Sequence, residues 1–267
     1  MGRAGWIGAA AAAVALACAG AGAGPALPAG AAVAEAGFID GFERFDPLRW
    51  YVSDGWRNGS WQDCDWSARS VALKEGALRL SYLPAGGGHG ARCGEVQTRA
   101  RYLYGTFEAR LRWDAAPGRV AAFFTYAGPS MGARHEEIDV ELPGAGQPVA
   151  SLTVWRDGAR ATTADIDLDA AAADGFVDVG FVWAPGRLTW YLAGRPVLSA
   201  PAEAVPTTPQ KIMLSHWGSA SMADWLGRGD PGRGATALAV DFVSYTPPGA
   251  PCLWQGSVAC ERAEGRR

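Results

Sequence analysis

The sequence has few lysines and histidines and lacks any cluster of basic residues. Its 24 basic residues are nearly all arginine, scattered singly, and 27 acidic residues outnumber them, which gives a formal net charge of −3. Proteins that bind nucleic acid or anionic membranes need clustered basic surface. The composition therefore gives no basis for a nucleic-acid partner.

Long apolar runs are also missing beyond the N-terminus, so no later segment could span a bilayer. The first residues, MGRAGWIGAAAAAVALACAGAGAG, carry one Arg and then an Ala-rich run that ends in small residues. This pattern is typical of a secretory signal peptide, with A-x-A sites at Ala17–Ala19 and Ala32–Ala34. We predict a signal peptide and small-residue linker over residues 1–34, a secreted or periplasmic protein, and no stable membrane insertion. An N-terminal anchor is the less favoured alternative, because the run is short and rich in Gly and Ala.

Cysteine and histidine are too few and too widely spaced for a zinc site. The three histidines lie far apart, and HEEID at 135–139 lacks the second His of a helical zinc motif. One of the five cysteines lies in the leader, and an even set of four in an exported chain favours disulfides. Of three possible pairings, the favoured one joins Cys64 to Cys93, with Cys252 to Cys260 closing a small C-terminal loop.

The chain shows no internal repeat, no second domain and no alternation of strands with helices. Instead, TFEARLRW at 106–113 alternates apolar with charged residues, and GFVDVGFVW, LTWYLAG, KIMLSHW and ALAVDFVSY are similarly β-rich. Turn signals such as RNGS, AGGGHG, APGR and WRDG separate them, and only DLDAAAADGF at 167–176 could form a helix. The pattern predicts an all-β sandwich of two antiparallel sheets packed face to face. We expect one domain over 35–247, a polar tail over 248–267 lying loosely on the surface, and a monomer.

One stretch, HEEIDVELPG at 135–144, concentrates acidic residues in an otherwise strand-like segment. On a strand, Glu137, Asp139 and Glu141 project from one face while the apolar residues between them enter the core. Three like charges on one ridge repel and raise one another's pKa, so folding gains nothing from them. An exposed strand face or a calcium site are the alternatives, although calcium carboxylates usually come from loops rich in Gly and Asn.

Such a ridge suits the cleavage of a glycosidic bond. That reaction needs one carboxyl group to protonate the leaving oxygen and another to attack the anomeric carbon or to activate water. A third carboxyl between them can separate the two working pKa values. Positions i and i+4 of a strand lie about 13 Å apart at Cα, so a retaining geometry with carboxyls about 5.5 Å apart requires both side chains to lean inward. Spacing alone leaves retention and inversion open.

The segment EIDVE resembles the E-[ILV]-D-x-E signature of glycoside hydrolase family 16. The resemblance extends from about Phe38 to Thr246. YGTFEARLRW, FVWAPGRLTWYLAG, KIMLSHWG, MADWLG and VDFVSYT follow in the order and spacing of bacterial lichenases, and DGWRNGSWQDCDWS and CGEVQT are similar to their N-terminal cleft segments. In that group the cysteines matching Cys64 and Cys93 form a disulfide.

The resemblance implies a β-jelly roll with a concave substrate cleft and a retaining double-displacement mechanism that requires no cofactor. It implies that Glu137 is the nucleophile, Asp139 the assisting carboxylate and Glu141 the general acid/base. The expected protein is a secreted endo-β-glycanase whose partner is a polysaccharide, either a β-1,3-1,4-type glucan or an exopolysaccharide.

The resemblance also implies a set of substrate contacts. Polar contacts are expected from Asn58 and Glu95, and stacking surfaces from Phe124, Trp217 and Trp225. The alternatives are a turn role for the Asn and ordinary core packing for Phe124 and Trp225.

A metal is the one further group that the resemblance suggests. Asp241 lies where some members hold a structural calcium ion. A strand-end Asp without a metal is equally compatible with the sequence.

Departures from the lichenase pattern limit the substrate assignment. His135 and Glu136 stand where lichenases usually have Trp-Asp, Gln97 stands for an Arg, and Thr153 and Trp155 stand for Asn and Tyr. The His before EEID is more like endo-glycanases that trim succinoglycan-type exopolysaccharides. A polysaccharide transglycosylase and a non-catalytic carbohydrate-binding module on the same scaffold remain the alternatives.

Overall fold

A computed structural model describes residues 33–34, 36–146, 148–168, 175–230 and 232–260. Residues 1–32 of the predicted signal peptide and linker, most of the possible helix at 167–176 and the last seven residues lie outside these ranges. Within them, helices are too short for any to cross a membrane.

Two sheets make up the described chain, and nearly all of their strands pair antiparallel. The first sheet runs in the order β14 (Arg195–Ala200), β13 (Arg187–Leu192), β12 (Val177–Ala184), β7 (Gly105–Trp113), β16 (Thr236–Thr246), β5 (Ala77–Tyr82), β4 (Val71–Lys74), with β1 (Phe38–Asp40) beside β16. The second runs β11 (Ala159–Asp167), β10 (Val149–Arg156), β9 (Glu136–Pro143), β8 (Arg119–Ala127), β15 (Lys211–Gly218), β6 (Arg92–Thr98), β2 (Trp50–Val52). Beside β6 lies β3 (Asp65–Trp66), the one described strand that pairs in parallel. The short helical turns are η1 (Ala68–Ser70), η2 (Pro129–Met131), η3 (Ala202–Ala204) and α2 (Ala223–Leu226).

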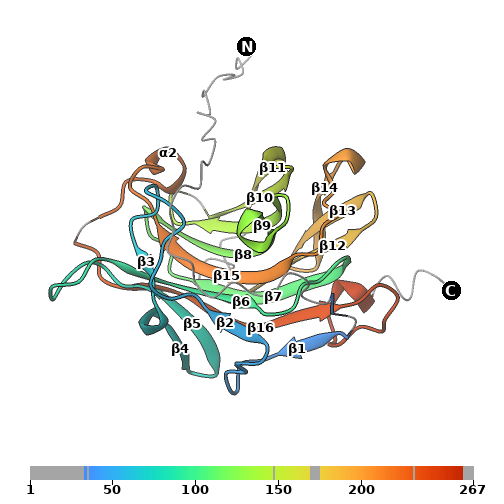
Figure 1. Cartoon of the computed structure of the whole chain (residues 1–267), viewed down its shortest axis with the longest axis horizontal. Coiled ribbons are helices and arrows are strands. Elements are labelled where there is room, and N and C mark those ends of the chain that lie inside the picture. The colour runs from blue at the N-terminus through green and yellow to red at the C-terminus, as the bar shows by residue number, and fades with distance from the viewer. Residues whose placement is uncertain (1–32, 35, 147, 169–174, 231, 261–267) are drawn as a thin grey trace, which may run out of the picture.

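The two sheets pack face to face over one large core, as the alternating sequence predicts (Figure 1). Apolar residues at every second strand position form this core. Phe123 of β8 stacks on Phe181 of β12 with ring centroids 5.9 Å apart, which joins one sheet to the other. In Figure 1, β8 and β15 of the second sheet lie above β7 and β16 of the first, and β8, β15 and β6 bend along their length. The all-β sandwich is therefore confirmed.

Both predicted disulfides are present. Cys64–Cys93 has a Cα–Cα distance of 5.7 Å, and Cys252–Cys260 has one of 5.0 Å. The first pair sits in a second, smaller apolar cluster with Trp66 and other aromatic residues beside β3 and β6. The favoured pairing is thus confirmed.

The prediction of a loosely attached tail is wrong for its described part, up to residue 260. Ser257 and Val258 are almost fully buried. The Ser257 hydroxyl and the Val258 amide donate hydrogen bonds of 2.6 and 2.9 Å to the carboxylate of Glu108 on β7. Trp254 packs edge-on against Phe242 of β16 at 4.9 Å. The tail therefore buries Glu108, which raises the pKa of its carboxyl, and the two hydrogen bonds from the tail offset part of that rise.

Candidate active site

Glu137, Asp139 and Glu141 of β9, which we call the acidic stripe, lie on the outer face of the second sheet. Ile138, Val140 and Leu142, between and beside them, are fully buried in the core. The neighbouring strands add side chains to the same outer face, and these fall into three rows. The rows are Tyr126–Glu137–Trp155, Phe124–Asp139–Thr153 and Ala122–Glu141–Ser151, in the order β8, β9, β10.

Burial and the neighbouring charges raise the pKa values of two carboxyl groups of the stripe, Asp139 and Glu141. Asp139 is 4% exposed, and burial, followed by the charges of Glu137 and Glu141, raises its pKa well above the ordinary value. Burial and the charge of Glu137 raise the pKa of Glu141 to about 8, against a lowering contribution from Arg160. Although part of Glu141 is open to solvent, its carboxyl is densely surrounded by protein. At neutral pH it therefore holds a proton that it can give to a leaving group.

Hydrogen bonds hold the Glu137 carboxyl and the backbone of Asp139. His135 Nε2 lies 2.8 Å from Glu137 Oε2. The Trp155 indole lowers the pKa of the neighbouring Asp139 carboxyl, whereas the Glu137 carboxyl raises it. On the core side, the indole N–H of Trp190 from the other sheet donates to the backbone carbonyl of Asp139 at 3.0 Å.

Glu95, one of the predicted polar contacts, belongs to a buried network on β6 and β15. The Ser53 hydroxyl donates to its carboxyl at 2.5 Å, and Gln97 accepts a hydrogen bond of 2.6 Å from the Lys211 ammonium. Burial raises the pKa of Glu95 to about 7, and the charge of Glu137 contributes to that rise. Burial, followed by Arg101, lowers the pKa of Lys211 to about 8. Glu95 is therefore electrostatically coupled to the stripe.

The three aromatic residues predicted to stack on sugar differ in their surroundings. Phe124 is half-buried and borders Asp139 in the register. Trp225 is half-buried, and its indole N–H donates at 3.1 Å to the hydroxyl of Ser151, which is Glu141's partner on β10. Trp217 is only 8% exposed, and its ring packs edge-on against Trp61 at 5.0 Å. The first two thus lie beside the acids, whereas Trp217 mainly packs the smaller apolar cluster.

Asn58 lies in an exposed turn and has local structural contacts. Its side-chain oxygen accepts a hydrogen bond of 3.2 Å from the indole of Trp66, and its backbone N–H donates to Gln62 at 3.2 Å. The turn interpretation of Asn58 agrees with these contacts. Sugar binding by Asn58 stays a prediction.

The surroundings of Asp241 do not fit an acidic calcium site. Its carboxylate faces the guanidinium of Arg110 at 3.8 Å. Within the described ranges, no group of three or more His, Cys, Asp or Glu residues is placed to hold a metal ion. Calcium binding at Asp241 stays a prediction.

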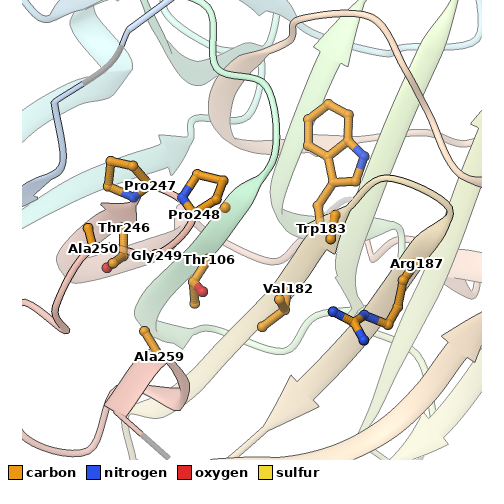
Figure 2. A pocket seen from close by; sticks show the side chains of 12 residues that line it. Thr106, Val182, Trp183, Arg187, Thr246, Pro247, Pro248, Gly249, Ala250 and Ala259 are labelled. Atoms are coloured by element: carbon orange, nitrogen blue, oxygen red, sulfur yellow. The ribbon is translucent and has the colours of Figure 1, made fainter. Parts of the chain in front are cut away.

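A pocket of about 400 Å³ lies at the first sheet, away from the stripe. Figure 2 shows Thr106, Val182 and Trp183 on one side and the start of the C-terminal segment, Pro247 and Pro248, on the other. Its described lining residues include no carboxylic acid. This pocket therefore cannot supply the paired acids that glycosidic cleavage needs.

Sequence reasoning left several residues beside the stripe without a role. His135 and Trp155 were noted only as departures from the lichenase pattern, and Tyr126 and Lys211 were not singled out. The period-two alternation of β8, β10 and β15 places these strand residues on the outer face. The alternation can be read from the sequence. The order of the strands in the sheet, which decides which of these residues lie beside the stripe, cannot.

Comparison with known proteins agrees with this geometry. The sequence profile described as Glycosyl hydrolases family 16 matches residues 58–233. The chain is 37% identical over 232 residues to the endo-1,3-1,4-beta-glycanase ExoK of Rhizobium meliloti (strain 1021), covering 85% of this chain and 86% of that protein. It is 32% identical over 223 residues to a beta-glucanase of Bacillus subtilis (strain 168), covering 83% and 91%.

Solved structures give the same result. A prokaryotic beta-1,3-1,4-glucanase (lichenase) derived from a mouse hindgut metagenome superposes with a TM-score of 0.75 at 32% identity. The match covers 79% of this chain and 99% of that one. Profile, relatives and fold all agree, and the chain belongs to glycosyl hydrolases family 16, whose members act on O-glycosyl bonds.

Proposed function

We propose that this protein is a secreted endo-β-glycanase that cleaves internal bonds of a β-1,3-1,4-type glucan or a related exopolysaccharide with retention of configuration. The observation that carries the proposal is the stripe of Glu137, Asp139 and Glu141 on the outer face of β9, where one carboxyl is held protonated and another is held by a histidine. The relatives, an endo-1,3-1,4-beta-glycanase, a beta-glucanase and a beta-1,3-1,4-glucanase (lichenase), support this substrate class. The Ala-rich leader and the two disulfides support export.

The proposed reaction has two steps. In the first, the Glu137 carboxylate attacks the anomeric carbon while Glu141 gives its proton to the glycosidic oxygen, so that the bond to the leaving sugar breaks and a glycosyl ester forms. In the second, Glu141, now ionised, takes a proton from water, which attacks the same carbon and releases Glu137. The charge of Glu137 raises the pKa of Asp139, so Asp139 would hold its proton less tightly once Glu137 loses its charge in the glycosyl ester. Two inversions give net retention.

The first experiment measures the release of reducing ends from barley β-glucan, laminarin and succinoglycan. The wild type should act on at least one of them, and Glu137→Gln should be inactive. Glu108→Gln is a matched control, because it removes a buried carboxylate from the other sheet. Binding without release by the wild type would favour a carbohydrate-binding module. Redistribution of chain lengths without new reducing ends would favour a transglycosylase.

A second experiment separates the roles of the two glutamates. With an activated aryl glycoside and sodium azide, Glu137→Ala should give the α-glycosyl azide, because azide replaces the nucleophile on the opposite face of the sugar. Glu141→Ala should give the β-glycosyl azide, because azide attacks the glycosyl-enzyme. The reverse pair of products would exchange the two assignments. NMR of the first wild-type product would test retention directly.

A further inference from the structure

The histidine that precedes β9 contacts the proposed nucleophile directly. His135 Nε2 lies 2.8 Å from Glu137 Oε2, and both side chains are mostly shielded from solvent, at 29% and 19% exposure. A nucleophilic carboxylate can only accept hydrogen bonds, so the ring nitrogen facing Glu137 must be the donor. A charge-assisted bond of this length restricts a side chain that would otherwise rotate freely.

The imidazole is itself held on several sides. Its ring stacks on Trp155, with centroids 5.4 Å apart and planes 20° apart, and Tyr126 packs against it at 5.4 Å. The cross-strand register explains this arrangement, because Tyr126 and Trp155 are the two partners of Glu137 on β8 and β10. The ring therefore lies among residues of three adjacent strands.

The turn between β10 and β11 fixes the backbone at the same point. Its Asp157 and Gly158 both have positive φ, 52° and 79°, as a tight two-residue hairpin turn requires. Gly158 N–H donates to the His135 carbonyl at 3.0 Å, and Arg134 pairs with Asp157 at 2.8 Å. The hairpin thus sets the position from which the His135 side chain starts.

Trp155, the other ring of the stack, interacts with the middle carboxyl of the stripe, that of Asp139. Its ring stacks on His135, its indole lowers the pKa of Asp139, and Arg160 lies over the indole at 5.2 Å from the ring centroid. The two stacked rings thus interact with two neighbouring carboxyl groups of the stripe, His135 by a hydrogen bond to Glu137 and Trp155 by its effect on Asp139.

We propose that His135 and Trp155 are a stacked pair of positioning residues that holds Glu137 and Asp139 in the geometry for attack. The proposal rests on the proposed function, because it needs Glu137 to be the nucleophile. Without the His135 donor, the Glu137 carboxylate would lose the hydrogen bond that restricts its rotation beside Asp139 and Glu141. Displacement of a reacting group by about 1 Å costs on the order of 100-fold in rate.

The test compares two substitutions at His135 that remove opposite properties. His135→Phe keeps a flat ring against Trp155 but has no donor, whereas His135→Gln keeps an N–H donor but loses the ring. With barley β-glucan, or whichever substrate of the panel the wild type cleaves, His135→Phe should lower kcat about 10- to 100-fold. KM and Tm should change little, and His135→Gln should retain more activity than His135→Phe. His89→Phe, in the exposed turn before β6, is the matched control and should behave as wild type.

Ordinary packing predicts the opposite order. If the ring only packs, His135→Phe should be near wild type and His135→Gln should lose Tm and activity together, which would overturn the proposal. Trp155→Phe gives a second reading, since it keeps a ring but removes the indole donor, and it should also lower kcat more than KM. Unchanged kcat in both Phe variants would refute the pair while leaving the proposed function intact. Full activity of Glu137→Gln would refute the proposed function itself.

Discussion

At the scale of single residues, the molecule places buried carboxyl groups where they destabilise the fold. Glu141 is surrounded by protein and faces the charge of Glu137, and its pKa is raised to about 8. Glu95 is raised to about 7 for the same leading reason, burial. A carboxyl that holds its proton at neutral pH is what a general acid needs. The same shift means that ionising the group costs folding free energy.

Glu141→Gln should therefore stabilise the protein in a pH-dependent way. The folded pKa of Glu141 lies above its ordinary value, so its contribution to stability is present below about pH 4.5 and is lost as the pH rises through 8. The amide of Gln has no proton to lose, so the variant keeps this stability at high pH. Thermal melts should show equal Tm values for variant and wild type at pH 4.5 and a higher Tm for the variant at pH 8. Glu203→Gln, in the exposed turn η3, controls for the loss of one negative charge. Equal Tm offsets at both pH values would contradict the raised pKa.

His216 should make the folded protein less stable at acidic pH. The ring is buried, lies 3.0 Å from the Val120 carbonyl and 2.9 Å from the Thr236 hydroxyl, and burial lowers its pKa to about 4. The unfolded chain takes up this proton near pH 6.5, so stability falls as the pH drops from 6.5 to 4, by roughly 3 kcal/mol for this group.

Urea midpoints at pH 7 and pH 4.5 would measure this effect. The wild type should lose more stability on acidification than His216→Asn, whose side chain does not titrate. His89→Asn, in an exposed turn, should lose as much as the wild type. If His216→Asn also lost as much, another group would control acid unfolding.

The acidic stripe could be predicted from the sequence, whereas its support could not. Period two alone places Glu137, Asp139 and Glu141 on one face, because that inference needs only neighbours in sequence. The contact of His135 with Trp155 needs the register between β9 and β10, which the nineteen residues between His135 and Trp155 do not specify. The sequence therefore predicts the three acids, whereas it shows His135 and Trp155 only as departures from the lichenase pattern.

At the scale of elements, alternation identified the strands but not the partners of their outer faces. Glu108 alternates with apolar residues in TFEARLRW, and this correctly placed it outside the core. The sequence did not indicate that Ser257 and Val258 would bind its carboxylate, because a polar tail with few apolar residues carries no periodic signal. Such a tail docks by a few specific contacts, and those depend on a surface formed by distant strands.

The two disulfides should differ in their contribution to stability. Cys64–Cys93 closes a loop with a sequence separation of 29, and Cys252–Cys260 one of 8. Loop-closure entropy predicts a stabilisation of roughly 3–4 kcal/mol for the first and about 2.5 kcal/mol for the second. The double variants Cys64→Ser/Cys93→Ser and Cys252→Ser/Cys260→Ser separate the two, which added reductant would not. Denaturation monitored by tryptophan fluorescence should show the larger loss for the first, and the reverse order would show that the C-terminal segment matters more to the fold than its loop size indicates.

At the scale of the whole molecule, the core and the chemistry lie on opposite faces of the same strand. Ile138 and Val140 of β9 are buried in the core, while the acids between and beside them face outward. The other sheet reaches this strand directly, because Trp190 of β13 donates to the Asp139 carbonyl. The first sheet is therefore more than a support for the fold, since it contacts the backbone that carries the middle carboxyl.

Trp190→Phe should consequently affect catalysis as well as stability. The change removes one buried donor and part of a ring, so the free energy of unfolding should fall by about 1–3 kcal/mol. Trp183→Phe is a matched control from the same sheet, because Trp183 is equally buried and its indole donates at 2.9 Å to the carbonyl of Pro206, outside β9. Both variants should lose similar stability in urea titrations. Only Trp190→Phe should lower kcat by several-fold at a temperature where both remain folded, because only that bond fixes the backbone of Asp139. Equal kcat values for the two variants would mean that sheet-to-sheet packing alone positions β9.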